Sequence, residues 1–217
     1  MMNTTYGKLT TGLIAVWFAF SLFASASHWF RTESGQPPLP LLLAVLVPIG
    51  AFLLWYRSSK SFREFVLSLS PRTLTVVHAW RMAGFGFLAL YAYGILPGYF
   101  ALPAGWGDVA IGATAIMAMD LANPNHRSGF VLWHLLGIAD LVTAIGAGAV
   151  AGVISPQSVA NAHQATTAPM TALPLSVIPT FAVPLFLIFH MICIEQATRW
   201  PKTMRNGISE RVDSLAA

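Results

Sequence analysis

The sequence predicts an all-α membrane protein built as a bundle of six transmembrane helices. Of its 217 residues, 56% are hydrophobic and only 9% are charged, and the mean hydropathy is +0.65. A soluble domain of this size could not bury so much apolar surface. Six apolar runs are each long enough to cross a bilayer, and the basic residues cluster beside the ends of these runs.

The expected spans follow one another along the whole chain, and no internal repeat or soluble segment separates them, so we expect a single domain over 1–217. The first run follows Lys8 and has small residues at 24–26, which is typical of a cleavable signal peptide. Because it continues through Phe30, we interpret it as a retained span. The expected spans are about 9–30, 38–56, 73–95, 105–122, 129–152 and 173–197.

The distribution of Lys and Arg predicts that both termini lie in the cytoplasm. Basic residues precede the first span and follow the second, fourth and sixth spans, whereas the stretches 97–104 and 155–172 contain none. By the positive-inside rule, the basic connections are cytoplasmic. Because these residues flank apolar runs and form no separate basic face, we expect no nucleic-acid partner.

Two local patterns stand out. Segment 58–70 alternates basic with aromatic and aliphatic residues, which is typical either of a short helix on the cytoplasmic interface or of an ordinary basic loop. In the last span, Pro179 and Pro184 lack backbone donors and free the carbonyls of Leu175 and Thr180. A helix interrupted in this way often borders a site or a pathway.

The residues most informative about function are the ionisable ones at membrane depth, because an unpaired charge near the centre of a span costs about 3 kcal/mol. We expect such side chains to converge in the bundle interior. For Asp120 and Glu195, near the inner interface, pairing with basic neighbours such as Arg127 and Arg199 is the simpler explanation. The set comprises His78, Arg81, Asp108, Asp120, His134, Asp140, His190 and Glu195.

One hypothesis is that histidines on facing helices bind a b-type haem. His78 and His134 lie at similar depth when counted at about 1.5 Å per residue from the cytoplasmic boundary. They would be the two axial ligands, and Arg81, one turn from His78, would neutralise a propionate. The chain would then carry electrons or act as a small membrane oxidoreductase with a redox partner that the sequence does not identify.

A separate metal site is expected from Asp108, Asp140 and His190, with Glu195 as a further candidate ligand. Carboxylate and imidazole ligands together suit manganese, iron or zinc. The single cysteine excludes a cysteine-rich metal site and an intrachain disulfide, and ligation without cysteine favours a redox metal over structural zinc.

Two alternatives use the same residues. The acids and histidines would line a proton or ion path in a small coupled transporter with a proline-broken helix, or they would form structural ion pairs and interhelical hydrogen bonds. No nucleophilic triad or nucleotide-binding glycine loop is present, which disfavours covalent hydrolysis. We expect a homo-oligomer in the lipid bilayer, because the chain is small and its helices are rich in Gly and Ala.

Several motifs between about 75 and 195 are distinctive. They are HAWR at 78–81 with Gly84, LP at 96–97, ALPAG at 101–105, GD at 107–108, WHLLG at 133–137, ADL at 139–141, and the prolines 174, 179 and 184 leading to His190. Together they resemble a widespread group of uncharacterised bacterial six-helix integral membrane proteins. The resemblance implies the cytoplasmic (inner) membrane of a bacterium and supplies no activity.

The same resemblance singles out Arg81, Asp108, Asp140 and His190 as matching positions. It also marks two departures: the group often has an amide in place of His134 and lacks a histidine in place of His78. The two expected haem ligands therefore stand where this chain differs from the group. This difference either marks a haem-binding branch of the group or undermines the assignment of haem.

Overall fold

The computed structural model describes residues 2–32, 36–154 and 165–201, and every regular element within them is a helix. Six helical stretches are long and apolar enough to cross a membrane, which confirms the predicted all-α, six-helix fold class. The basic tail beyond residue 201 lies outside the described ranges. The six stretches are Thr5–Ala26, Leu39–Ser58, Pro71–Ala92, Gly98–Asp120, Pro124–Val150 and Ile178–Thr198.

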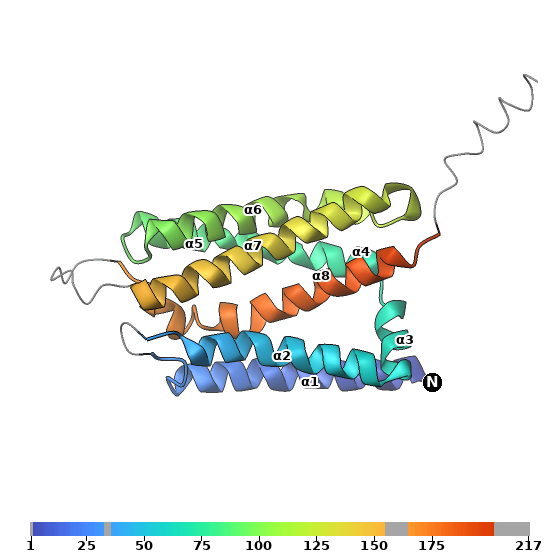
Figure 1. The fold of residues 1–217 in the computed structure, drawn as a ribbon, viewed down its shortest axis with the longest axis horizontal. Helices are drawn as coiled ribbons and strands as arrows, with labels where there is room; N and C mark the ends of the chain where they lie inside the picture. The colour runs from blue at the N-terminus through green and yellow to red at the C-terminus, as the bar shows by residue number, and fades with distance from the viewer. Residues whose placement is uncertain (1, 33–35, 155–164, 202–217) are drawn as a thin grey trace, which may run out of the picture.

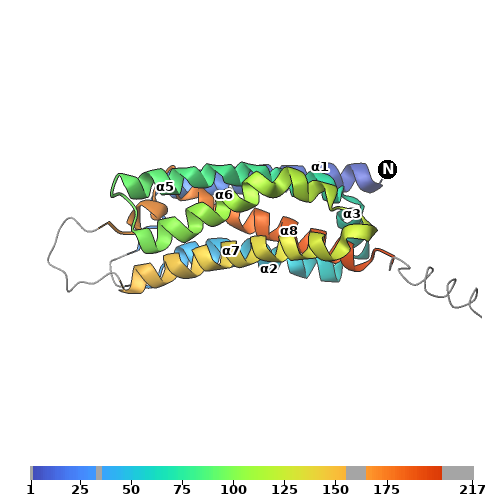
Figure 2. The ribbon, with the colours of Figure 1, turned by 90° about the horizontal axis from the view of Figure 1, so that it is seen from above.

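The last helix, α8 (Val183–Thr198), runs through the middle of the bundle. Figure 1 shows it between α1 (Met2–Ala26) and α2 (Leu39–Ser58) on one side and α6 (Gly98–Asp120) and α7 (Arg127–Ile154) on the other. In the view turned by 90° it again lies between α1 and α2 (Figure 2). α6 and α8 are the most buried of the six spans, so the interior of the bundle is centred on them.

The third span changes its helical geometry along its length. It consists of α4 (Pro71–Val76), the 3₁₀-helix η1 (Val77–Gly84) and α5 (Phe85–Ala92). A 3₁₀-helix has three residues per turn, so side chains three positions apart lie on one line. His78, Arg81 and Gly84 follow this spacing and all three are buried. The local geometry therefore turns a histidine, an arginine and a glycine toward the same neighbour.

That neighbour is α6, and glycines allow the close approach. A Cβ on Gly84 would lie 2.8 Å from the carbonyl oxygen of Gly105, and a Cβ on Gly112 would lie 2.6 Å from the backbone nitrogen of Met82. Side chains larger than hydrogen do not fit at such distances, which is why small residues favour close helix packing in membranes. The crossing places Asp108 of α6 directly beside η1.

The last span begins with a π-helical turn, η4 (Ile178–Ala182), that leads into α8. Pro184 has no N–H to donate to the carbonyl of Thr180. That carbonyl instead accepts hydrogen bonds from Nε1 of Trp17 at 3.1 Å and from Oγ of Ser21 at 3.3 Å. The carbonyl freed by the proline thus attaches α1 to the centre of the bundle.

Segment 58–70 contains a helix, α3 (Lys60–Ser68), at the end of the bundle where the N-terminus lies (Figure 1). Its buried face carries Phe62 and Phe65. Gln196 of α8 fixes the end of this segment, because its Nε2 donates to the carbonyl of Leu69 at 2.8 Å and contacts two preceding carbonyls. The helix is therefore part of the packed bundle.

The fourth span is longer than its apolar run. α6 begins at Gly98, ahead of the span expected at 105–122, because the helix accommodates Pro103 and the glycines that lower the hydropathy of this stretch. Pro97 precedes it in an extended conformation. Two short 3₁₀ turns complete the described elements, η2 (Pro124–His126) and η3 (Ala168–Thr171).

Candidate metal centre

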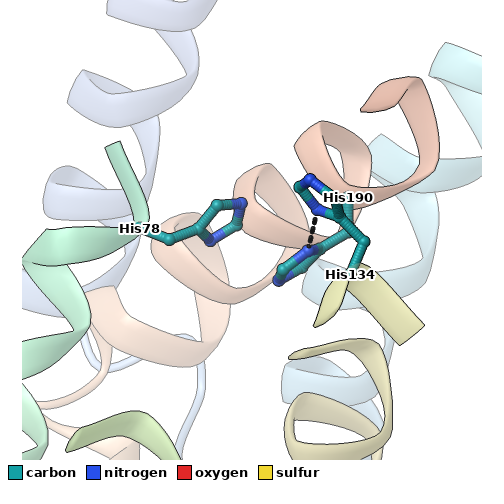
Figure 3. A group of neighbouring side chains, drawn as sticks. All are labelled: His78, His134 and His190. Carbon is teal, nitrogen blue, oxygen red and sulfur yellow. Dashed lines mark hydrogen bonds between the residues drawn. The ribbon is translucent and has the colours of Figure 1, made fainter. Parts of the chain in front are cut away.

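Three histidines from three helical segments meet in the interior of the bundle (Figure 3). His78 comes from η1, His134 from α7 and His190 from α8, and all three are completely buried. One nitrogen of each ring can be chosen so that the three atoms lie within 4.8 Å of one another. Because imidazole nitrogens bind metals such as zinc at about 2.0–2.1 Å, this histidine cluster could hold one metal ion after small side-chain shifts.

The rings of the histidine cluster contact one another directly. Nδ1 of His134 lies 2.7 Å from Nδ1 of His190, and the ring of His78 stacks on that of His190 with centroids 3.9 Å apart. Neither nitrogen of His78 has a hydrogen-bond partner within the described residues. An unpaired buried polar group costs about 1–3 kcal/mol, so His78 is the ring that a bound ion would stabilise most.

Aromatic side chains enclose the histidine cluster. The ring of Phe130 lies 4.4 Å from that of His134, and the ring of Phe186 lies 5.1 Å from that of His78, measured between centroids. Trp133 lies within 5.7 Å of all three imidazoles, and its own Nε1 donates to a threonine of α6 at 2.9 Å. These contacts restrict how far each imidazole can turn.

Two glycines make room for the polar side chains. A Cβ on Gly137 would collide with the imidazole of His190, and a Cβ on Gly107 would collide with the carboxylate of Asp140. Gly137 lies three residues after His134 on α7. One face of α7 therefore carries one histidine of the cluster and leaves the space for another.

Beside the histidine cluster, a buried arginine bridges two carboxylates. Nε of Arg81 donates to Oδ1 of Asp108 at 2.7 Å, and its Nη2 donates to Oδ2 of Asp140. The Arg81 side chain is 1% exposed, and those of Asp108 and Asp140 are 16% and 14% exposed. When both carboxylates are ionised, this ionic network has a net charge of −1, which is costly in a membrane interior unless a proton or another cation is bound.

Arg81 connects the ionic network to the histidine cluster. Its Nη1 lies 3.4 Å from Nε2 of His190 and 3.4 Å from the carbonyl oxygen of Gly137. A guanidinium can only donate, so Nε2 of His190 is the acceptor and the proton of that neutral ring is on Nδ1. The carboxylates and the imidazoles are therefore parts of one contiguous site.

The same reasoning assigns the remaining protons. Nδ1 of His190 donates to Nδ1 of His134, which leaves the proton of His134 on Nε2. That nitrogen donates to Oγ1 of Thr75 at 3.3 Å, and the Thr75 hydroxyl donates to the carbonyl of Pro71 at 2.7 Å. A continuous hydrogen-bonded chain thus runs from Arg81 to the start of α4.

Six of the residues considered from the sequence meet here. Arg81 contacts Asp108, Asp140 and His190, which were expected to share a metal site or an ion pair. His78 and His134, expected as haem ligands, lie with ring centroids 6.1 Å apart, and His190 contacts both. The histidine that the sequence grouped with the carboxylates therefore lies in the same cluster as the other two.

Glu195 lies apart from this site. Its Oε1 accepts hydrogen bonds from the hydroxyl of Tyr56 at 3.2 Å and from Nη2 of Arg199 at 2.6 Å. Asp120 pairs with Arg72 at 2.9 Å, across two helices, and not with the Arg127 considered from the sequence. The side chains of Asp120 and Glu195 are 70% and 39% exposed, in agreement with the simpler explanation of both as interfacial acids.

Two residues of the site were missed at the level of sequence. Thr75 is completely buried and lies three positions before His78. The series Thr75, His78, Arg81, Gly84 repeats every three residues, and this period, typical of a 3₁₀-helix, was the available signal. For Trp133 no comparable signal exists, because a tryptophan in an apolar run is also typical of the membrane interface.

A family described as a domain of unknown function (DUF8737) matches residues 37–197, most of the chain. The match includes the three histidines, Arg81 and both aspartates of the ionic network, and it leaves out α1. Comparison with curated proteins and with solved structures finds no match.

Proposed function

The chain belongs to the family of the domain of unknown function DUF8737, and we propose from the geometry of the histidine cluster that it holds a transition-metal ion between His78, His134 and His190. The observation that carries this proposal is the state of His78. It is completely buried and stacked on a second imidazole, and neither of its nitrogens is bonded within the described residues. Buried histidines that serve only packing use their nitrogens in hydrogen bonds.

The charge of the surroundings supports a bound cation. The ionic network of Arg81, Asp108 and Asp140 has a net charge of −1 when its carboxylates are ionised. A divalent ion on the histidine cluster would offset this charge at short range. Such pairing is worth most where water is excluded, as among these buried rings.

The ligand chemistry favours iron, copper or zinc over manganese. All three candidate ligands are neutral imidazoles, which suit these metals, whereas manganese prefers oxygen ligands. The one cysteine, Cys193, is buried outside the cluster, and its Sγ donates to the carbonyl oxygen of Pro71 at 3.9 Å. Three protein ligands leave a coordination position open, as in catalytic metal sites.

Ion binding would compete with one hydrogen bond of the cluster. The Nδ1 atoms of His134 and His190 share a proton in the described geometry, and an ion bound to both would displace it toward Nε2 of His190. Arg81 would then keep its two carboxylates and the carbonyl oxygen of Gly137 as partners. With iron or copper bound, the proposed role is redox: the change of charge at the open metal site would be coupled to a nearby arginine and two carboxylates, in a small membrane oxidoreductase.

A haem would need more space between these residues than a single ion needs. A bis-histidine haem needs a macrocycle between His78 and His134, yet His190 stacks on His78 and hydrogen-bonds to His134. A single ion needs no such space, so it is the favoured cofactor. A Soret band in the purified protein would reverse this choice.

Metal analysis of purified variants tests the proposal. The wild type is expected to bind about one ion per chain, as one cluster allows. His78→Ala, His134→Ala and His190→Ala should each lose it. His126→Ala is the matched control, because His126 is exposed on η2 and its Nδ1 lies 3.2 Å from Oδ1 of Asn123. Retention of a full equivalent in all three cluster variants would refute the proposal.

A second candidate function is proton transfer, and the hydrogen-bonded chain from His190 through His134 to Thr75 favours it. Such a chain passes a proton when each member releases one and accepts another. Proton flux into liposomes would separate the two functions, because a proton path predicts flux from metal-free protein and the metal proposal predicts none.

We further propose the cytoplasmic membrane of a bacterium, with both termini inside. In support, α3 with its Lys and Arg residues, the start of α7 at Arg127 and the end of α8 before Arg199 all lie at the end of the bundle that also contains the N-terminus (Figure 1). Labelling of Ser59→Cys and Gln36→Cys in a Cys193→Ser background tests this orientation. An impermeant reagent on intact cells should modify only the cysteine at 36.

A further inference from the structure

A cavity of about 400 Å³ lies between α2, α6, α7 and the π-helical turn η4. Pockets for small molecules typically have about 300–1,000 Å³ and a mostly apolar lining with a few placed polar groups. This cavity fits that description. Its lining includes Val45, Phe100, Leu141 and Ile178, and Asp108 is the one charged residue among the described residues that line it.

Asp108 presents an unused acceptor to this cavity. Its Oδ1 is held by Nε of Arg81 at 2.7 Å, while its Oδ2 has no hydrogen bond within the described part of the chain. The side chain is 16% exposed although it lies on the inner side of α6, and the cavity is the space that exposes it. An ionised carboxylate only accepts, so a ligand must bring a donor.

We propose that this cavity binds a largely apolar, membrane-soluble molecule through a hydroxyl group that donates to Oδ2 of Asp108. A neutral hydroxyl enters an apolar cavity without the large desolvation penalty of a charged group. A hydrogen bond to a charged acceptor is also stronger than one between neutral groups. Hydroquinones and long-chain alcohols share this chemistry. The bound hydroxyl would lie two contacts from His190, through Arg81.

Binding at the cavity does not require the metal, so the test uses the full chain in detergent both metal-loaded and metal-stripped. Calorimetry would compare a short-tailed hydroquinone, the matching quinone and an alkanol of equal length. We expect the hydroquinone or the alkanol to bind both forms about 10- to 150-fold more tightly than the quinone, since a hydrogen bond to a charged group contributes about 1.5–3 kcal/mol. Preference between these two identifies the source as a quinol or a lipid alcohol.

Three variants complete the experiment. Ala144→Phe fills the cavity and should abolish binding, whereas Val142→Phe, on the outward face of the same helix, should not. Asp108→Asn can donate to a carbonyl, so it should shift the preference from hydroquinone toward quinone. No binding of either hydroxyl compound, unchanged binding by Ala144→Phe, or an unchanged preference in Asp108→Asn would overturn the inference. If the wild type takes up no metal ion but still binds the hydroxyl compound, the metal site is refuted and the ligand cavity is not.

Discussion

Nη1 of Arg81 lies 3.4 Å from Nε2 of His190. This contact joins two groups of residues that have separate reasons to be buried: the carboxylates that neutralise the arginine, and the imidazoles that gather on three helical segments. Because an arginine cannot release its proton in a protein, the contact fixes which nitrogen of His190 accepts. Arg81 therefore sets the state of the histidine cluster in which an ion would bind.

Replacing Arg81 by lysine should strengthen metal binding, because the contact of Arg81 with Nε2 of His190 keeps a proton on the Nδ1 atom that an ion would use. A lysine has no planar fork, so it cannot contact Asp108, Asp140 and His190 together. Loss of a competing hydrogen bond of about 0.5–1.5 kcal/mol should raise the metal affinity by up to about tenfold. The matched control is Arg72→Lys, whose pair with Asp120 is exposed. Competition titration with a chelator measures both, and equal affinities in the two variants would contradict the role given to Arg81.

Gly137→Ala should remove the metal without unfolding the bundle. A Cβ at this position collides with the imidazole of His190, so the ring must leave its place beside His134. Gly146→Ala on the same helix is the control, because nothing lies within 4 Å of a Cβ there. Circular dichroism should show equal helix content in both variants. Metal content should fall only in Gly137→Ala, and a full equivalent in that variant would be evidence against the described geometry.

Thr75→Val should lower metal affinity through His134. The valine keeps the shape of threonine but cannot accept from Nε2 of His134, so the imidazole loses the contact that orients it. Thr143→Val is the control, since the exposed Thr143 hydroxyl donates to the carbonyl of Ala139 on its own helix. We expect affinity about 10–100-fold below wild type for Thr75→Val and unchanged affinity for Thr143→Val. Identical affinities would show that Thr75 has no part in the site.

Removal of the metal should lower the thermal stability of the bundle, because the ion connects η1, α7 and α8. A ligand present at a hundredfold excess over its Kd stabilises the folded state by about 2.7 kcal/mol. Unfolding of wild-type protein should therefore shift to lower temperature with a chelator and recover when metal is added. His78→Ala should unfold at one temperature under both conditions. A metal-dependent shift in that variant would place the ion elsewhere.

Much of the fold follows from hydropathy alone. Six apolar runs predict six spanning helices, and the described residues contain six helices long and apolar enough to cross a membrane. The helix ends are less predictable, as α6 shows. Its first turns contain Pro103 and several glycines, which lower the hydropathy, yet the helix extends to Gly98 because Pro97 provides a suitable start. Sequence composition therefore predicts the number of spans better than their limits.

The site was predictable to a smaller degree. The cost of charge in lipid required Arg81, Asp108 and Asp140 to find partners, and they meet one another. Depth along a helix could not decide which histidines join, since an error of a few residues at about 1.5 Å each is as large as the separation of the rings. The π-helical turn η4 also precedes α8, and a π-turn departs from the 3.6-residue period on which a facing argument for His190 would depend.

X-ray absorption spectroscopy of the metal-loaded protein is the sharpest test of the three-histidine metal centre, because it counts the imidazoles bound to the ion. Three imidazole nitrogens at about 2.0–2.1 Å are expected in the wild type, and no ion bound to histidine is expected in His78→Ala. Sulfur ligands, a porphyrin signature, or an identical spectrum in His78→Ala would contradict a metal centre formed by His78, His134 and His190.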